Sequence, residues 1–307
     1  MGFKQYLDLQ PKVREALVSG RPVAAMDSGI VAAQGGPHGR GLEMARRAQE
    51  IMEEQGVTPA IIAILDGRVR VGLEEEELER VVSDEKSIKT SCRDLPTVVA
   101  TRHTGATTVA ATAFLAVAAG IRVVVTSGIG GVRRGGDHTF DISADLFQLS
   151  RIPAAVVCSG VDLSQDPALT LEYLETQGVP VIGVGTNDFP NFYTPSSGCQ
   201  VSCRFDDMAS LANMIHVKDN LRVEGGLLVA NPIPEEYALD LELLQPALAQ
   251  AMEEAEERKL RGKFLTPFLL ERLAQLTKGA TVEARLQILY HNARIGAQLA
   301  AQLARLE

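Results

Sequence analysis

Short apolar runs alternate with segments of helical spacing along the first three quarters of the chain. The apolar runs cover residues 22–26, 60–65, 121–126, 154–158, 179–184 and 226–230. Short continuous runs of this kind are typical of strands that are buried on both faces. Segments that favour helices lie between them, at 42–55, 74–82, 143–149 and 170–176. This alternation predicts an α/β fold with a largely parallel central sheet.

Further patterns refine this picture. Asp66-Gly67 separates the run at 60–65 from a short return run at 69–71, which predicts a hairpin. Residues 105–120 are small and apolar on nearly every face, which predicts a central, buried helix. The C-terminal region is expected to be almost entirely helical, at 235–262, 268–277 and 281–307. Residues 187–198 have a loop-like composition and are expected to form a lid or a linker.

Composition and charge narrow the classes of function. The chain has 307 residues and a formal net charge of −9, so binding to nucleic acid or to an anionic membrane through general charge is not expected. The longest apolar stretches are too short to span a membrane, and the first residues lack the apolar core of a secretion signal. We therefore expect a cytoplasmic protein. Its four cysteines do not form a disulfide framework for a chain of this length.

The candidate chemistry lies after the predicted strands. In open parallel sheets, ligands bind beyond the carboxyl ends of the strands, which selects loops at 27–38, 89–96, 128–145, 159–166 and 231–235. The segment 128–146, GIGGVRRGGDHTFDISADL, is the richest of these. A glycine-rich turn follows a buried strand there, and arginines, a histidine and several acids come directly after it. Groups that bind phosphate, hold a metal ion or transfer protons are all present.

Acidic residues recur every four positions in this segment. If residues 141–145 include the start of a helix, Asp141 and Asp145 lie on one face of it. Two carboxylates placed in this way suit Mg²⁺ or Mn²⁺, held partly through water. The alternative is that Asp141 or Ser143 caps the amino terminus of the helix.

Three other positions carry candidate chemistry. Asp27 ends a strand in front of the glycine-rich stretch 28–41, which would hold a phosphate or form a plain loop. Asp27 itself would be a functional acid, a turn former or a helix cap. Lys89 would bind phosphate, act as a nucleophile if desolvated, or lie on the surface. Thr108 belongs to a GATT sequence that would cap a helix or bind an anion.

Taken in order, these segments resemble the pseudouridine-5′-phosphate glycosidases, the indigoidine-synthase A-like group. The matching motifs are TSGIGGVRRGGDHTFDISADL at 126–146, RDLP at 93–96, GATTVA at 105–110, LEYLETQGVP at 171–180 and LLVANPIPEEYA at 227–238. The resemblance implies one domain over residues 1–307, folded as an α/β/α layered sandwich, and a homotrimer. It implies reversible cleavage of pseudouridine 5′-phosphate, a C-nucleoside phosphate, into uracil and ribose 5-phosphate, aided by a divalent ion, Mn²⁺ rather than Mg²⁺.

The resemblance also implies roles for individual residues. Asp141 and Asp145 match the family's acids that serve the metal ion and its waters. Arg133 is a further candidate for contact with substrate. The remaining matched positions imply contacts with the phosphosugar or the base, at Lys89, Thr108, Val109, Ser143, Ala144, Asp145 and Asn292.

Three positions depart from the family pattern. The family's general acid/base glutamate is replaced by Asp27, and its imine-forming lysine by Asp162. The family's histidine in a VHR sequence is replaced by Arg133. An aspartate cannot form an imine, so the resemblance implies that binding of the sugar phosphate is kept while the covalent chemistry is changed.

Three functions are compatible with this pattern. The first is an enzyme that acts on a ribose-5-phosphate C- or N-glycoside, with Asp27 and Asp162 as a carboxylate pair or with Lys89 as a replacement imine-forming residue. The second is a C-glycoside-forming synthase of a natural-product pathway that uses ribose 5-phosphate. The third is a phosphosugar-binding protein without catalytic activity.

Overall fold

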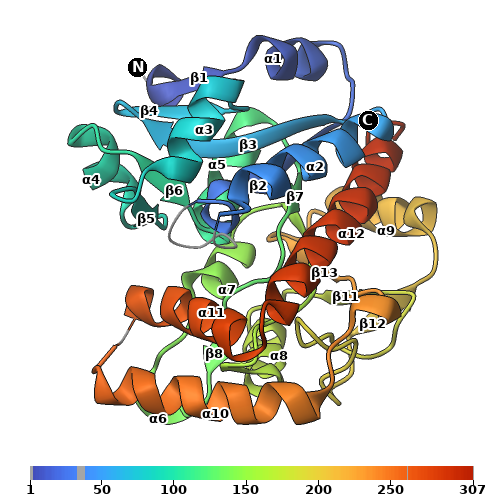
Figure 1. Cartoon of the computed structure of the whole chain (residues 1–307). Coiled ribbons are helices and arrows are strands. Elements are labelled where there is room, and N and C mark those ends of the chain that lie inside the picture. Colours follow the sequence, from blue (N-terminus) through green and yellow to red (C-terminus); the bar gives the residue numbers. More distant parts are fainter. Residues whose placement is uncertain (1–2, 33–38, 261, 307) are drawn as a thin grey trace.

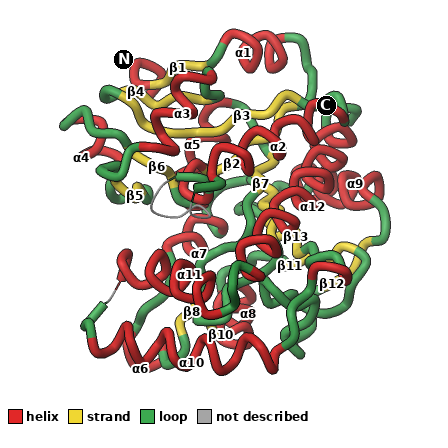
Figure 2. Tube along the Cα trace, in the orientation of Figure 1, coloured by secondary structure: helices red, strands yellow, loops and turns green. Residues whose placement is uncertain are grey.

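A mostly parallel sheet forms the centre of the computed structural model, which describes residues 3–32, 39–260 and 262–306 (Figures 1 and 2). Within these residues the sheet has eleven strands, with the order β1-β4-β3-β2-β7-β9-β13-β11-β12, and β6 pairs with both β3 and β5. The strands are β1 (Leu7–Leu9), β2 (Val23–Asp27), β3 (Thr58–Leu65), β4 (Arg68–Val71), β5 (Ile88–Thr90), β6 (Gly105–Thr107), β7 (Val123–Val125), β9 (Ala155–Cys158), β11 (Val181–Val184), β12 (Cys203–Phe205) and β13 (Leu227–Ala230).

The central strands are buried on both faces, as their continuous apolar runs predict. Every residue of β2, β7, β9 and β13 is buried, and these strands run parallel to one another. The antiparallel hairpin predicted from Asp66-Gly67 is confirmed between β3 and β4. Both turn residues have positive φ, 54° and 79°, as a two-residue hairpin turn requires.

Helices cover both faces of the sheet, which confirms the α/β layered fold (Figure 1). One face packs against α2 (Gly41–Glu54), α3 (Glu75–Ser83), α9 (Met208–Asn220) and α12 (Ala280–Leu303). The other packs against α1 (Pro11–Val18), α4 (Leu95–Ala100), α5 (Val109–Ala119), α7 (Ala144–Leu149) and α8 (Pro167–Thr176). Helices α10 (Leu241–Glu257) and α11 (Leu265–Leu276) pack together beyond the sheet, with smaller apolar clusters of their own.

Several boundaries differ from the sequence predictions. Residues Gly105–Thr107 form a strand, and α5 begins only at Val109, because Thr108 caps it by accepting a hydrogen bond from the Ala111 N–H. The predicted helix over 235–262 is a 3₁₀ turn, Glu235–Tyr237, followed by α10. The pattern missed β12 and α9. The segment 187–198 is not a linker, because Phe189 and Tyr193 are completely buried in it. Its role as a lid stays a prediction.

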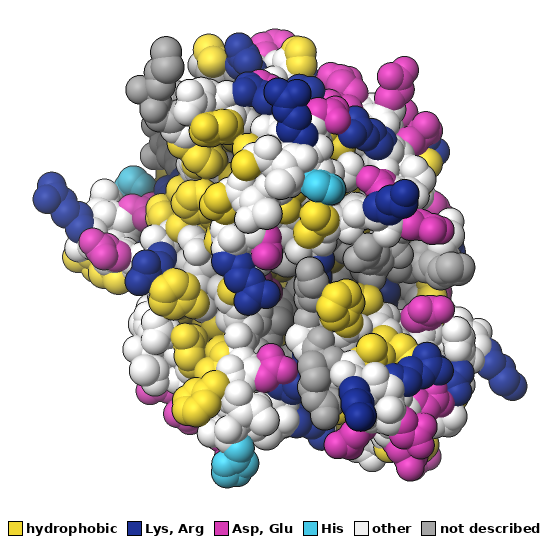
Figure 3. Space-filling view, turned by 90° about the vertical axis from the view of Figure 1, so that its left-hand side faces the viewer, with side chains coloured by type: hydrophobic (Ala, Val, Ile, Leu, Met, Phe, Trp, Pro, Cys, Tyr) yellow, Lys and Arg dark blue, Asp and Glu magenta, His cyan; other side chains and the backbone are white. Residues whose placement is uncertain are grey.

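The surface shows no segregation of charge on the face seen in Figure 3, where basic and acidic side chains are interspersed among apolar ones. Within the described ranges, no helix combines the length and the apolar composition needed to cross a membrane.

Asn292 ties α12 to the ends of the central strands. Its side chain is fully buried. The amide Nδ2 donates to the Thr126 carbonyl at 2.8 Å, and Oδ1 accepts a hydrogen bond from Asn231 Nδ2 at 2.8 Å. A further bond joins it to Ser159 Oγ. These contacts position the ends of β7, β9 and β13, and they leave the amide occupied within the protein.

We expect Asn292→Leu to lower the free energy of unfolding by about 3 kcal/mol, because buried polar groups of Asn231, Ser159 and Thr126 lose their partner. Urea denaturation measures the change. Asn213→Leu, at an exposed position of α9, is the matched control and should change stability by less than about 0.5 kcal/mol. Equal stability of the two variants would contradict this structural role.

Candidate active site

A cavity of about 410 Å³ opens at the carboxyl ends of the central strands, between the β5–β6 pair and α11. Its volume lies within the range of about 300–1,000 Å³ that is usual for small-molecule sites. It brings together nearly all of the predicted site residues, namely Asp27, Lys89, Thr108, Val109, Arg133, Asp141, Ser143, Ala144, Asp145 and Asp162. Asn292 is the exception. The prediction that it contacts substrate is wrong for this structure, because its buried amide is bonded within the protein and does not line the cavity.

Asp27 is a buried acid at the last position of β2. Only 2% of the residue is exposed, and within the described residues Asp27 Oδ1 has no hydrogen-bond partner. Burial raises the pKa of Asp27 to about 7; hydrogen bonding to Thr126 opposes this, the Asp145 carboxylate adds to it and Lys89 opposes it. The side chain makes no capping bond to the short helix that follows. The capping alternative is therefore wrong, and Asp27 is an acid that changes protonation near neutral pH.

The strand end that carries Asp27 is held firmly. The hydroxyl of the next residue, Ser28, is buried and accepts a hydrogen bond from the Thr107 N–H at 2.9 Å. The Thr107 hydroxyl in turn donates to the Ile62 carbonyl at 2.7 Å. This chain of bonds fixes the end of β2 against β6 and β3. The glycine-rich stretch that follows falls partly on residues 33–38, which lie outside the described residues.

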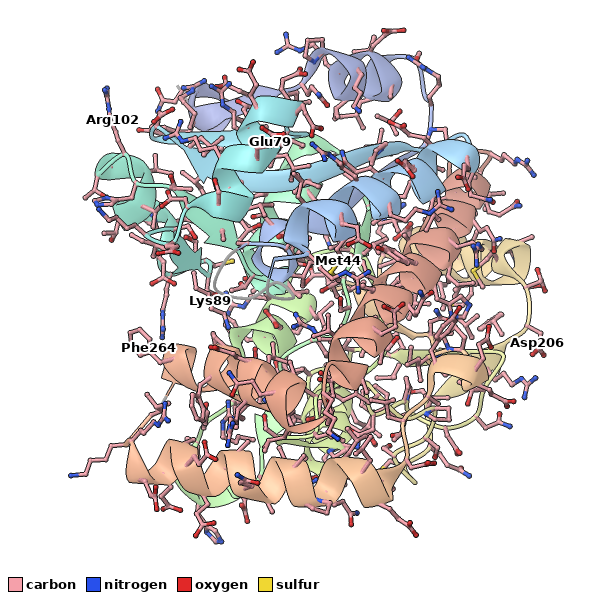
Figure 4. The ribbon with its side chains drawn as sticks, viewed as in Figure 1. Met44, Glu79, Lys89, Arg102, Asp206 and Phe264 are labelled. Atoms are coloured by element: carbon pink, nitrogen blue, oxygen red, sulfur yellow. The ribbon has the colours of Figure 1, made fainter. Side chains whose placement is uncertain are left out.

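Lys89 lies in the middle of β5 and lines the cavity. Figure 4 shows it between the β5–β6 pair and α11. The residue is only partly exposed, and its charge is close enough to Asp27 to stabilise that carboxylate. The alternative of a plain surface lysine is therefore wrong.

Asp145 joins two walls of the cavity. One carboxylate oxygen accepts the Ala110 N–H at 2.8 Å, and the other accepts the Gly130 N–H at 2.9 Å. The bond to Ala110 anchors the first turn of α5, and the bond to Gly130 anchors the glycine-rich turn after β7. Gly130 can have no side chain, because a Cβ there would lie 2.3 Å from Ser143 Oγ. Asp145 is thus an internal anchor of the site.

Asp141 lies outside the helix. Helix α7 begins at Ala144 and is capped by Ser143, whose hydroxyl accepts a bond from the Asp145 N–H. The prediction that Asp141 and Asp145 share one helix face is therefore wrong, and the capping alternative is confirmed for Ser143. Asp141 Oδ2 instead accepts a hydrogen bond from Arg133 Nε at 2.8 Å.

The hydrogen-bond partners of Asp141 and Asp145 test whether these carboxylates could hold the predicted metal ion. Both oxygens of Asp145 are bonded to backbone amides, and Asp141 is paired with a guanidinium. Across the part of the chain that the structure describes, no three His, Cys, Asp or Glu side chains gather as metal ligands would. These bonds do not fit a divalent ion chelated by both carboxylates together. The expectation of Mn²⁺ stays a prediction.

Asp162 lies on the loop after β9. One of its oxygens accepts hydrogen bonds from the backbone N–H and the hydroxyl of Ser164. Arg285 of α12 also lines the cavity, and Asp162 and Tyr193 both act on its charge. Arg285 is 5% exposed, and burial lowers the pKa of its guanidinium. A protein that only binds a phosphosugar would be favoured if Asp27 and Asp162 pointed away from the cavity, but both residues line it.

Arg285 was not predicted as a site residue, because the C-terminal region was predicted to be helical and no functional residue but Asn292 was sought there. The spacing of Arg285 from buried residues of α12 could have indicated that it is buried. Arg285 follows the buried Thr281 by four residues and precedes the buried Asn292 by seven, so it falls on the apolar stripe of α12. A charged residue on such a stripe is rarely left buried without a partner or a role.

A titratable acid and an amine around a cavity at the strand ends define an α/β enzyme with an acid–base site. The chain belongs to the family of indigoidine synthase A-like proteins, whose family model matches residues 12–302. It is 48% identical to a pseudouridine-5′-phosphate glycosidase from Caldanaerobacter subterraneus subsp. tengcongensis, with 99% of each chain covered. It is 45% identical to a protein of the same name from Alkaliphilus metalliredigens, with 99% of this chain and 98% of the relative covered.

Two solved structures share the fold. The prealnumycin C-glycosynthase AlnA, in complex with ribulose 5-phosphate, superposes with a TM-score of 0.89 and 33% identity, covering 98% of each chain. An indigoidine synthase A-like protein from Thermotoga maritima superposes with a TM-score of 0.88 and 35% identity, covering 97% of each chain. Both confirm the α/β fold over nearly the whole length.

The raised pKa of Asp27 predicts a pH-dependent stability. The folded state binds the proton up to about pH 7, whereas an unfolded aspartate releases it near 3.8, so burial of this group costs stability as pH rises between these values. Asp27→Asn has no such proton to bind, so its free energy of unfolding relative to that of the wild type should be higher at pH 8 than at pH 5. The expected increase is on the order of a few kcal/mol, since one pKa unit corresponds to about 1.4 kcal/mol.

Thermal or urea unfolding at the two pH values measures this difference. Asp206→Asn, at an exposed aspartate labelled in Figure 4, is the control. A stability difference for Asp27→Asn that does not change with pH would contradict the assigned ionisation.

Proposed function

We propose that this chain cleaves the C1′ glycosidic bond of a ribose-5-phosphate C-nucleoside, with pseudouridine 5′-phosphate as the substrate and uracil and ribose 5-phosphate as the products. The names of its relatives support the substrate. The single observation that carries the chemistry is Asp27, a buried acid with a pKa of about 7 that lines the cavity. A C–C glycoside can leave only when its ring carbon is protonated, and such an acid is suited to supply the proton.

The proposed step uses the two carboxylates in different states. Asp27 donates its proton to the ring carbon as the bond from that carbon to C1′ breaks, and the bonding electrons stay with the base. Asp162, whose carboxylate accepts two hydrogen bonds from Ser164, stabilises the positive charge that develops at C1′. Water then adds to C1′, and Asp162 accepts its proton. Transfer of that proton back to Asp27 through solvent closes the cycle, and one water is consumed.

The remaining cavity residues would bind the sugar phosphate. Lys89 supplies a positive charge, and Thr108 and Val109 form the start of α5, where the helix dipole favours an anion. Ser143 and Ala144 form the start of α7, which the Asp145–Ala110 hydrogen bond joins to the start of α5. No step of this proposal is routed through a metal ion. From the family resemblance we also propose that the whole chain folds as one domain, and that it acts as a homotrimer in the cytoplasm.

Synthesis in the opposite direction is a second candidate. The solved C-glycosynthase with ribulose 5-phosphate is similar to this chain over nearly its full length. Bond formation would use the same groups in reverse, with Asp27 accepting the proton that leaves the ring carbon. Incubation with uracil and ribose 5-phosphate tests whether the reaction runs in this direction.

Release of uracil from pseudouridine 5′-phosphate is the direct test. We expect the wild type to release it, with activity that falls above about pH 7 because Asp27 loses its proton. Asp27→Asn and Asp162→Asn are each expected to lower kcat by roughly 10²- to 10⁴-fold. Asp206→Asn should leave it unchanged. Wild-type turnover that both variants retain would exclude the carboxylate pair, and absence of turnover would exclude this substrate.

Borohydride reduction in the presence of ribose 5-phosphate tests the alternative that Lys89 forms an imine with C1′. If Lys89 binds phosphate as proposed, mass spectrometry should find no sugar adduct on it. The matched controls are Lys89→Arg and Lys86→Arg, since Lys86 is exposed three residues away. An adduct that Lys89→Arg removes and Lys86→Arg keeps would assign the imine to Lys89.

A further inference from the structure

Arg133 occupies the centre of the acidic part of the cavity. Its side chain is only 14% exposed. Nε donates to Asp141 Oδ2 at 2.8 Å, and Nη1 donates to Ser164 Oγ at 3.1 Å. The Ser164 hydroxyl is bonded in turn to Asp162. One guanidinium therefore links the loop that carries Asp141 to the loop that carries Asp162.

The backbone holds Arg133 in this place. Its N–H donates to the Asp141 carbonyl at 3.0 Å. Strand β8 (Val132–Arg133) pairs antiparallel with β10 (Gln165–Asp166), with Arg133 opposite Gln165. The guanidinium is thus fixed by main-chain pairing as well as by its own hydrogen bonds, which makes it a preorganised charge.

The charges in this region are already matched. The carboxylate of Asp141 is paired with the guanidinium of Arg133, and the charge of Asp162 favours the charged form of Arg285. A divalent ion that took Asp141 Oδ2 as a ligand would have to displace a charge-assisted hydrogen bond. It would also approach the positive charge of the Arg133 guanidinium.

We infer that Arg133 supplies, as a permanent guanidinium, the positive charge that a divalent metal ion would otherwise provide beside Asp141, so that this chain works without a bound metal ion. A guanidinium has no open coordination position, but it donates hydrogen bonds to phosphate, hydroxyl and carboxylate oxygens in fixed directions. The anionic ligand of the cavity would therefore meet Arg133 in the place of metal-bound water.

Metal binding tests the inference directly. The probe is Mn²⁺ alone, titrated into the full-length protein at neutral pH and followed by the electron paramagnetic resonance signal of the free ion. The wild type is expected to bind less than 0.1 equivalent per chain, a level set at about tenfold below a single site. Arg133→His replaces the fixed cation by an imidazole, a good ligand for Mn²⁺ beside a carboxylate. We expect this variant to bind Mn²⁺ at least tenfold more tightly.

Arg134→His is the matched control, because Arg134 is the exposed neighbour of Arg133, and it should behave like the wild type. One equivalent of Mn²⁺ bound by the wild type would overturn the inference. Equally weak binding by folded Arg133→His would overturn the assignment to Arg133.

A second measurement needs no variant. The melting temperature of the wild type is compared in EDTA and in millimolar MnCl₂, since an ion that binds the folded state raises it. We expect no difference, and a rise with Mn²⁺ would overturn the inference. These readouts do not depend on the proposed reaction. If uracil is not released, the proposed function fails while the metal titration still decides the role of Arg133.

Discussion

The cavity depends on one carboxylate, that of Asp145, which accepts a backbone N–H from each of two walls. One bond fixes the start of α5 and the other fixes the glycine-rich turn after β7. The residue is buried. Because each of its carboxylate oxygens accepts a hydrogen bond, the group is held in one orientation. Its negative charge also acts on Asp27 and helps to raise the pKa of that acid. The same side chain therefore builds the site and sets the electrostatic conditions for its chemistry.

The two candidate catalytic acids lie in contrasting surroundings. Asp27 is almost completely buried and has an oxygen without a partner among the described residues. Asp162 is partly exposed, accepts hydrogen bonds from Ser164 and lies near Arg285. Two acids in such different environments are suited to different roles in one reaction. The cavity thus holds two carboxyl groups in different environments, which is the arrangement on which the proposed reaction depends.

Sequence reasoning predicted what depends on local pattern. The buried strands follow from their apolar runs, and the hairpin at Asp66-Gly67 follows from the positive φ that this turn requires. Sequence reasoning failed where a side chain binds a partner that is distant in sequence, or where several local partners are equally compatible with the pattern. Four-residue spacing placed Asp141 and Asp145 on one helix face, but a cap at Ser143 and a bond to Arg133 decide their positions. The motif match likewise suggested that Asn292 contacts substrate, although its amide is bonded to strand ends more than 60 residues away in sequence.

The electrostatic interaction between Asp162 and Arg285 has a consequence for substitutions at position 162. These residues come from distant parts of the chain, a loop after β9 and the buried side of α12, yet their charges offset one another. A lysine introduced at position 162 alone would replace a negative charge that acts on a buried guanidinium by a positive one. The effect of a lysine at position 162 is therefore expected to depend on the residue at position 285.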